Sequence, residues 1–224
     1  MEEVGRITRA AGVVSFFTLL SRLTGLLRDM VVGYLFGAQG MADAFFVAFR
    51  IPNLLRRLTA EGALTAGFIP VFTDCLTNRG KAEAMRVARI VFTFLGLFLA
   101  VLTLLGMLFA APLTQLFAPG FLADREKFGL TVFLTRLMFP YVFFVSLVAL
   151  AMGVLNSLRH FMAPALSPVL LNLSIICCAI LFAPWMEIPV ISLGYGVLLG
   201  GVAQLLLQLP YLSRQGFTYS PDFH

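Results

Sequence analysis

The chain alternates long apolar runs with short segments that contain glycine, proline or charge. Six of these runs offer the roughly 20 mostly apolar residues that a helix needs to cross a bilayer. They fall at approximately 11–36, 42–71, 87–108, 130–155, 164–183 and 191–212. The pattern therefore predicts an all-α membrane protein with six transmembrane helices. The window 42–71 is the least apolar, and its charges also suit an amphipathic helix on the membrane surface.

Basic residues fall on one side of the membrane if all six windows cross it. The basic positions on that side are Arg6, Arg9, Arg79, Lys81, Arg86, Arg89, Arg159 and Arg214. The opposite segments contain Arg125 and Lys127, which Asp124 and Glu126 offset. The positive-inside rule then places both termini in the cytoplasm. Leaving out the window 42–71 would break this alternation, so we keep it as a span.

Composition supports the membrane assignment. Of the 224 residues, 60% are hydrophobic and only 12% are charged, with a mean hydropathy of +0.95. Ordinary soluble domains carry about 25% charged residues. The net charge of +5 follows from the positive-inside bias, so we expect no nucleic-acid partner. The acidic start Met1-Glu2-Glu3 is unlike a cleavable signal peptide, and the first apolar run is expected to remain as a membrane helix.

Little in the sequence points to catalysis or to a cofactor. The three cysteines (Cys75, Cys177 and Cys178) have neither a disulfide framework nor metal-ligand spacing, and the two histidines are isolated. Catalytic motifs and nucleotide-binding glycine loops are not recognisable. We therefore expect a protein that is not an enzyme and that needs no metal or cofactor.

Glycine pairs in two windows predict close helix contacts. Gly33 and Gly37, and likewise Gly196 and Gly200, have the small-xxx-small spacing that lets helices approach.

The charges inside the first two windows are the most informative feature. A guanidinium at membrane depth costs about 2.5–3.5 kcal/mol, and it stays charged because its pKa exceeds about 12. In the first window Arg22, Arg28 and Asp29 lie within two turns, and Gly25 permits a bend. The second window has a polar stripe at about 100° per residue. The stripe comprises Asp43, Arg50, Asn53, Arg57 and Glu61, with Arg56 beside it.

Arginines outnumber carboxylates within the predicted spans. Adding Arg136 from the fourth span gives six arginines against Asp29, Asp43 and Glu61. Ion pairs that hold helices together would leave three positive charges without partners. The surplus favours a wet cavity that binds an anion, and the planar guanidinium suits a phosphate or pyrophosphate. Purely structural pairing is the alternative.

Two stretches carry a family resemblance. The segments Ser21–Asp29 and Ala42–Arg57, continued by Phe68-Ile69-Pro70 and Ala118-Pro119-Gly120-Phe121, resemble the MurJ (MviN) lipid II flippases. The resemblance implies that residues 1–224 form the N-terminal six-helix lobe of a two-lobe alternating-access transporter, whose C-terminal lobe is absent from this chain. It implies export of undecaprenyl-pyrophosphate-linked disaccharide-peptide across the bacterial inner membrane for cell-wall synthesis. The partners it implies are lipid II, the membrane, the C-terminal lobe and a coupling ion.

The resemblance also assigns roles to the charged residues. It implies pyrophosphate binding by Arg22, Arg28 and Arg56, gating or ion pairing by Asp29, Asp43 and Glu61, and support from Arg50, Asn53 and Arg57. Two alternatives remain open: an exporter of another polyprenyl-pyrophosphate-linked glycan, and a membrane scaffold of cell-wall synthesis that transports nothing. Surplus arginine disfavours a cation exporter. The lack of a nucleophile and a general base disfavours an intramembrane enzyme.

Overall fold

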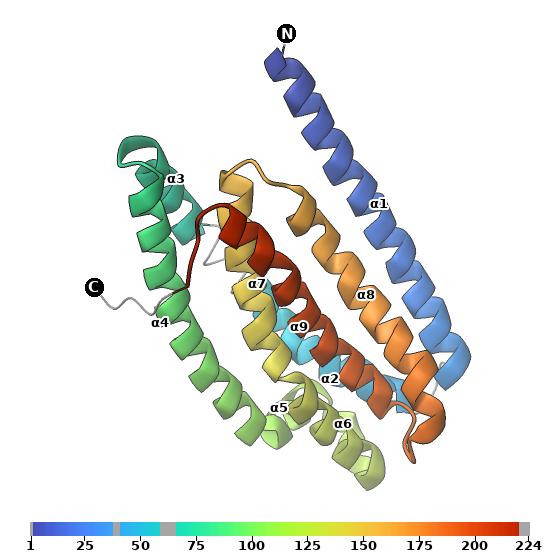
Figure 1. Ribbon diagram of the computed structural model, residues 1–224. Helices are drawn as coiled ribbons and strands as arrows, with labels where there is room; N and C mark the ends of the chain where they lie inside the picture. Colours follow the sequence, from blue (N-terminus) through green and yellow to red (C-terminus); the bar gives the residue numbers. More distant parts are fainter. Residues whose placement is uncertain (1, 38–40, 59–65, 220–224) are drawn as a thin grey trace.

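The protein is a helical bundle whose long helices run up and down between its two ends; the packed pairs α1/α8 and α7/α9 run in the same direction (Figure 1). The computed structural model describes residues 2–37, 41–58 and 66–219, and this part of the chain contains no β-strand. Its α-helices are α1 (Glu2–Phe36), α2 (Met41–Arg56), α3 (Ile69–Asn78), α4 (Lys81–Leu108), α5 (Ala110–Phe117), α6 (Arg125–Met138), α7 (Pro140–Ser157), α8 (Met162–Phe182) and α9 (Ile191–Arg214). Two short 3-10 helices, η2 (Pro119–Ala123) and η3 (Ala183–Trp185), lie in the connections.

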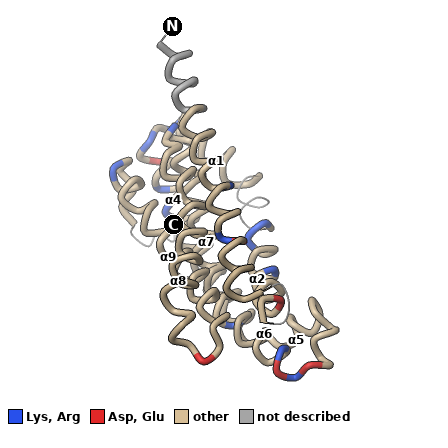
Figure 2. Tube along the Cα trace, turned by 90° about the vertical axis from the view of Figure 1, so that its right-hand side faces the viewer, with Lys and Arg blue, Asp and Glu red and all other residues tan. Residues whose placement is uncertain are grey.

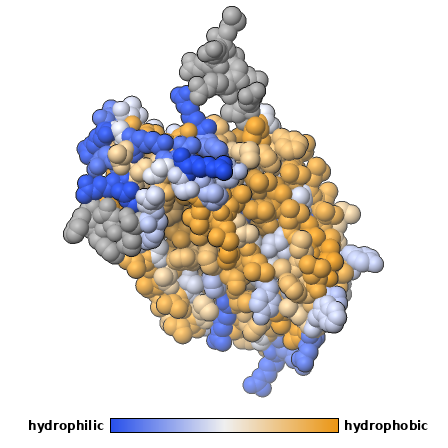
Figure 3. Space-filling model, viewed as in Figure 1, coloured by the Kyte–Doolittle hydropathy of each residue, from blue (hydrophilic) through white to orange (hydrophobic). Residues whose placement is uncertain are grey.

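Four helical stretches of the described chain are long and apolar enough to cross a membrane. They are Lys81–Leu108, Arg125–Ser157, Met162–Trp185 and Ile191–Arg214. These stretches cover the predicted windows 87–108, 130–155, 164–183 and 191–212, and α1 covers the window 11–36. On the face shown in Figure 3, apolar side chains form a broad band, with hydrophilic side chains towards its two ends. The prediction of an all-α, multi-pass membrane protein is confirmed.

The prediction of a single helix over residues 42–71 needs correction. One helix was expected there, but the structure describes α2 and α3, with π-helical residues 57–58 and 66–68 at their facing ends. The two helices have different neighbours: α2 packs mainly on α6, whereas α3 packs on α4 and α7. Residues 59–65 lie outside the described chain, and so does the predicted gating residue Glu61.

The ends of the helices alternate between the two ends of the bundle. The N-terminal end of α1, the α3–α4 turn and the α7–α8 turn lie at one end in Figure 1. The start of α2, the connection from α4 to α6 and the α8–α9 turn lie at the other. Arg79, Lys81 and Arg159 belong to turns of the first group. Most of the Lys and Arg positions lie towards the ends, but some lie at mid-height beside α2 (Figure 2).

Two glycines let α8 and α9 pack closely against each other. A Cβ atom added to Gly196 would lie 2.7 Å from the Cα of Ile175, and one added to Gly200 would lie 3.2 Å from the Cα of Leu171. The two backbones can approach this closely only because both positions lack a side chain, so the predicted Gly196/Gly200 contact is confirmed. The pair in α1 is different. Gly33 has no neighbour within 4 Å of such a Cβ, and Gly37 ends α1 with a φ of +70°.

The α6–α7 junction is also fixed by a glycine. The predicted fourth span divides at Phe139-Pro140, and the ring of buried Phe139 occupies the space that a side chain at Gly106 of α4 would need. Proline at the first position of α7 is compatible with a new helix start because it has no N–H to satisfy. The structure thus holds α6 and α7 against α4 at this point.

Candidate functional site

A cavity of about 580 Å³ lies among α1, α2, α7, α8 and α9. Its polar lining comprises Arg28, Asn53, Arg56, Tyr141, Asn156, Ser167 and Gln204. Apolar residues such as Phe49, Val148 and Met152 complete the wall. Two of the three arginines predicted to bind pyrophosphate, from two different helices, therefore line one cavity.

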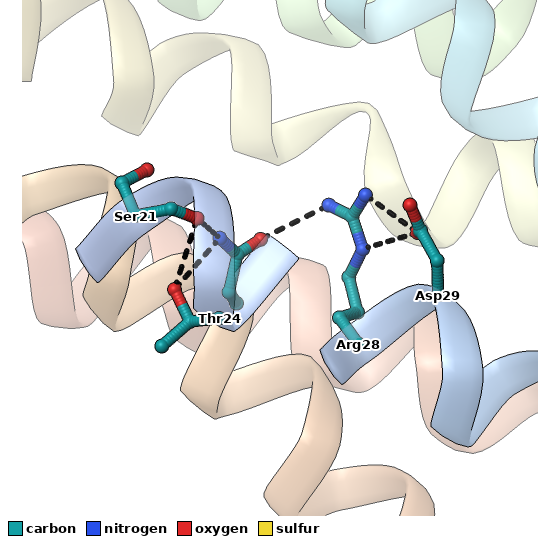
Figure 4. Close-up of polar contacts among 5 residues, drawn as sticks. Ser21, Thr24, Arg28 and Asp29 are labelled. Atoms are coloured by element: carbon teal, nitrogen blue, oxygen red, sulfur yellow. Dashed lines mark hydrogen bonds and ion pairs between the residues drawn. The ribbon is translucent and has the colours of Figure 1, made fainter. Parts of the chain in front are cut away.

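Arg28 of α1 is held on two sides (Figure 4). Its Nε and Nη2 donate hydrogen bonds of 3.0 and 2.8 Å to Oδ1 of Asp29, and its Nη1 donates a 3.0 Å hydrogen bond to Oδ1 of Asn172. The Arg28 side chain is 26% exposed and that of Asp29 is 57% exposed. Asp29 therefore forms an ion pair with the neighbouring arginine, and its gating role stays a prediction.

Asn172 of α8 is a site residue that sequence reasoning missed. It is 6% exposed, and its Nδ2 donates to the carbonyl oxygen of Ser21 at 3.2 Å and to Oγ1 of Thr24 at 3.3 Å. The only available signal was a single amide in the long apolar run 164–183. Such an amide must find partners, because an unsatisfied polar group in an apolar environment is unfavourable.

Arg56 of α2 is held in a similar way. Its Nε donates a 3.0 Å hydrogen bond to Oδ1 of Asn53, one helical turn earlier. Both side chains are partly buried and both line the cavity. Phe49, Asn53 and Arg56 follow the i, i+4, i+7 spacing of one helix face. The cavity face of α2 is therefore this row.

The polar stripe predicted on α2 is rotated relative to that face. Arg50 and Arg57, predicted as supporting residues, are exposed and are not among the residues that line the cavity. Arg136 also points elsewhere, since its Nε donates to the carbonyl oxygen of Met107 at 3.2 Å.

Arg22 lines a second cavity of about 720 Å³ between α1, α7 and α8. Thr18, Ser21 and Phe161 also contribute to its wall. Both cavities have Met152, Asn156 and Pro168 in their linings, so they are neighbours. Arg22 is exposed, and in the described chain no hydrogen bond or ion pair involves its side chain. The three predicted arginines thus divide between two adjoining spaces.

Asp43 lies at the opposite end of α2 from Arg56. The two residues are 13 positions apart, roughly 20 Å along the helix. Asp43 pairs with Lys127 of α6, whose Nζ lies 2.9 Å from Oδ2 and 4.4 Å from the centroid of the Phe121 ring. Asp43 therefore forms its ion pair outside the cavity that Arg28 and Arg56 line, and its gating role stays a prediction. Charge counting within the spans missed Lys127, because it precedes the predicted fourth window.

The cavity chemistry suits an anion. Guanidinium groups supply positive charge and donors, and the polar lining residues Asn53, Ser167 and Gln204 are neutral. Among the described residues no three His, Cys, Asp or Glu side chains come together as a metal site would require. A phosphate-like group fits such a setting because arginine can bond two of its oxygens at once.

These features define a multi-pass helical membrane protein with an arginine-lined internal cavity. Comparison with known proteins identifies the family. The family profile described as "Lipid II flippase MurJ" matches residues 32–224. The chain belongs to the MurJ lipid II flippase family.

Individual relatives agree with this assignment. The lipid II flippase MurJ of Burkholderia cenocepacia is 45% identical over 92% of this chain and 40% of its own length. A probable lipid II flippase MurJ of Vibrio cholerae is 41% identical over 97% of this chain and 43% of its own length. A solved structure, lipid II flippase MurJ in an inward closed conformation, superposes with a TM-score of 0.77 at 26% identity, covering 94% of this chain and 43% of that one. The chain spans about two fifths of these relatives.

Proposed function

We propose that this chain is the N-terminal lobe of a flippase that moves lipid II, the undecaprenyl-pyrophosphate-linked peptidoglycan precursor, from the inner to the outer leaflet. Arg28 and Arg56 grip the pyrophosphate in the cavity, and Arg22 contacts the anion in the adjoining space. The polyprenyl tail stays in the lipid beside the helices. The protein moves its cargo and does not convert it chemically.

The observation that carries this proposal is the meeting of Arg28 and Arg56 in one cavity of an apolar bundle. A charged group at membrane depth is unfavourable unless it faces a cavity or a partner. Asp29 accepts from only one side of Arg28. The names of the relatives supply the cargo, since a pyrophosphate clamp alone would suit other lipid-linked glycans.

The remaining parts of the transporter follow from the same proposal. A second lobe, supplied by the part of the protein that this chain does not span, closes the cavity from the other side, and the two lobes rock about the bound anion. The lobe lies in the bacterial inner membrane with both chain termini on the cytoplasmic side. The basic turns at one end of the bundle support this orientation. A coupling ion or the membrane potential drives the cycle.

The test is Arg28→Ala in the full-length protein. The cavity then loses a charge and the donors that face the ligand, so lipid II translocation in reconstituted vesicles should fall at least tenfold, and complementation of a depleted strain should fail. A hydrogen bond to a charged group contributes about 1.5–3 kcal/mol, and each 1.4 kcal/mol is about tenfold. The matched control is Arg79→Ala, which removes an exposed arginine of the α3–α4 turn.

Normal export and growth with Arg28→Ala would refute the proposal. Replacing lipid II by another lipid-linked glycan in the same vesicles distinguishes the cargo. Equal translocation of both would favour a broader exporter. Binding without translocation of either would favour a scaffold.

A further inference from the structure

We propose that Asn172 is a positioning residue for anion binding: it fixes the orientation of Arg28 while leaving its charge available. The inference rests on the proposed function and extends it to a residue of α8 that has no charge. It starts from the three hydrogen bonds that join Asn172 to α1.

The contacts of Asn172 determine which way its amide faces. Its Nδ2 meets two acceptors, the carbonyl oxygen of Ser21 and Oγ1 of Thr24, at 3.2 and 3.3 Å. Its Oδ1 meets the Nη1 donor of Arg28 at 3.0 Å. A flipped amide would turn two donors towards a guanidinium that only donates. The network is therefore consistent in one orientation alone, and it ties Arg28 to the backbone one to two turns earlier in α1.

The same contacts determine which donors of Arg28 remain. A guanidinium has five N–H donors. Asp29 accepts one from Nε and one from Nη2, and Asn172 accepts one from Nη1. Two N–H donors remain outside these three hydrogen bonds, one on Nη1 and one on Nη2. Such a pair can bond two oxygens of one phosphate group. Asn172 and Asp29 together thus restrict the guanidinium so that its terminal N–H groups serve the cavity.

Neutrality is the second part of the inference. Position 172 is 6% exposed, so a charge on the side chain there would act on Arg28 with little screening by water. An amide holds the guanidinium without cancelling its charge, whereas a carboxylate at the same position would give Arg28 a second acidic partner beside Asp29. Arg56 repeats the arrangement, because the side-chain oxygen that accepts from its Nε belongs to Asn53. Each cavity arginine is therefore braced by an amide.

The experiment measures binding of farnesyl pyrophosphate to the purified full-length protein in detergent. Asn172→Leu removes the brace, and Asn172→Asp keeps a hydrogen-bond acceptor of the same shape but adds a negative charge. We expect both variants to weaken binding about tenfold. Only the loss in Asn172→Asp arises from added charge, and because position 172 is buried this loss should persist as salt rises. The control is Asn78→Leu, which removes an exposed amide that pairs with Asp74 on α3.

A double-mutant cycle separates positioning from general packing. If Asn172 acts through Arg28, Asn172→Leu causes no further loss of binding in an Arg28→Ala background, whereas independent effects would add. Additive losses, or unchanged binding in Asn172→Asp, would overturn the inference. Asn172→Asp keeps the test decisive if the leucine variant does not fold, because its shape matches asparagine.

The outcomes for Arg28 and Asn172 distinguish the two proposals. If Arg28→Ala binds the pyrophosphate as the unaltered protein does, the proposed function fails and the inference on Asn172 falls with it. If Arg28→Ala loses binding while Asn172→Leu and Asn172→Asp retain it, only the inference on Asn172 is overturned.

Discussion

The two faces of α8 differ in how they meet their neighbours. Towards α9 the helix packs backbone against backbone, with Gly196 and Gly200 opposite Ile175 and Leu171. Towards α1 it presents Asn172, whose contacts are hydrogen bonds to side chains and to one carbonyl. One face has no room for a methyl group, whereas the other meets its neighbour through hydrogen bonds to polar groups.

This difference shows how a membrane bundle can be rigid and still hold a polar site. In lipid, close packing of small residues supplies much of the association between helices. The α8–α9 pair uses it and forms a firm support. Buried polar side chains on the other face are costly unless they are satisfied, so that face is organised by specific hydrogen bonds. Its geometry can respond to a ligand, because breaking one such bond does not separate the helices.

Substituting the glycine at the close contact should have the largest effect. In Gly196→Leu a side chain would have to occupy space held by the Ile175 backbone, so α8 and α9 must separate. Overpacking typically costs 1–3 kcal/mol, and here more is expected because backbone cannot yield as a side chain can. Thermal unfolding of the full-length protein in detergent should show a much lower midpoint or little folded protein.

The control for this variant is Gly33→Leu, which replaces an α1 glycine that has no neighbour within 4 Å of an added Cβ. It should leave the unfolding midpoint close to that of the unaltered protein. Equal destabilisation by the two variants would contradict the close α8–α9 contact as the cause of the loss.

An intermediate effect, on binding alone, is expected from Arg56→Gln. The variant keeps a polar side chain in the cavity but removes the positive charge, and a hydrogen bond to a charged group contributes about 1.5–3 kcal/mol. Affinity for a lipid pyrophosphate should fall about tenfold or more, since 1.4 kcal/mol is about tenfold. The unfolding midpoint should change little. A variant that lost stability but kept affinity would show that Arg56 supports the fold and does not bind the anion.

The smallest effect is expected at the ion pair between α2 and α6. Asp43 and Lys127 are 45% and 21% exposed in their side chains, so water screens their attraction. Exposed pairs contribute about 0.2–1 kcal/mol, and a cycle of Asp43→Asn, Lys127→Met and the double variant should return a coupling energy in that range. A coupling well above it would show that this end of α2 is held as firmly as the α8–α9 interface.

The sequence was sufficient for the helical class and for part of the site. Long apolar windows predicted the four helical stretches of α4 to α9. The surplus of arginine singled out six arginines, because charge inside an apolar run has few explanations. The family resemblance selected Arg28 and Arg56 from these, together with Arg22. The glycine spacing on α9 found a real contact. The same spacing on α1 did not find one. Gly37 is a glycine because the end of α1 needs a positive φ there, and a spacing rule cannot distinguish this use of glycine from close packing.

Other parts of the site depend on tertiary structure. The partner of Asp43 lies 84 positions away on α6, and Asn172 lies 144 positions from Arg28. A helical wheel of one segment contains no information on either. The helical wheel was right only in part for α2: Asn53 of the polar stripe and the adjacent Arg56 line the cavity, whereas Arg50 and Arg57 of the same stripe do not.

The position of Asp29 directly beside Arg28 has a consequence for turnover. A carrier must make half of its cycle without cargo, and a bare guanidinium would oppose that return through the low-dielectric interior of the bilayer. Asp29 forms an ion pair with Arg28, so under the proposed function it would keep the unloaded cavity closer to electroneutral at this point. Under the same proposal it would also limit how tightly an anion is held, which would favour release after each transport step.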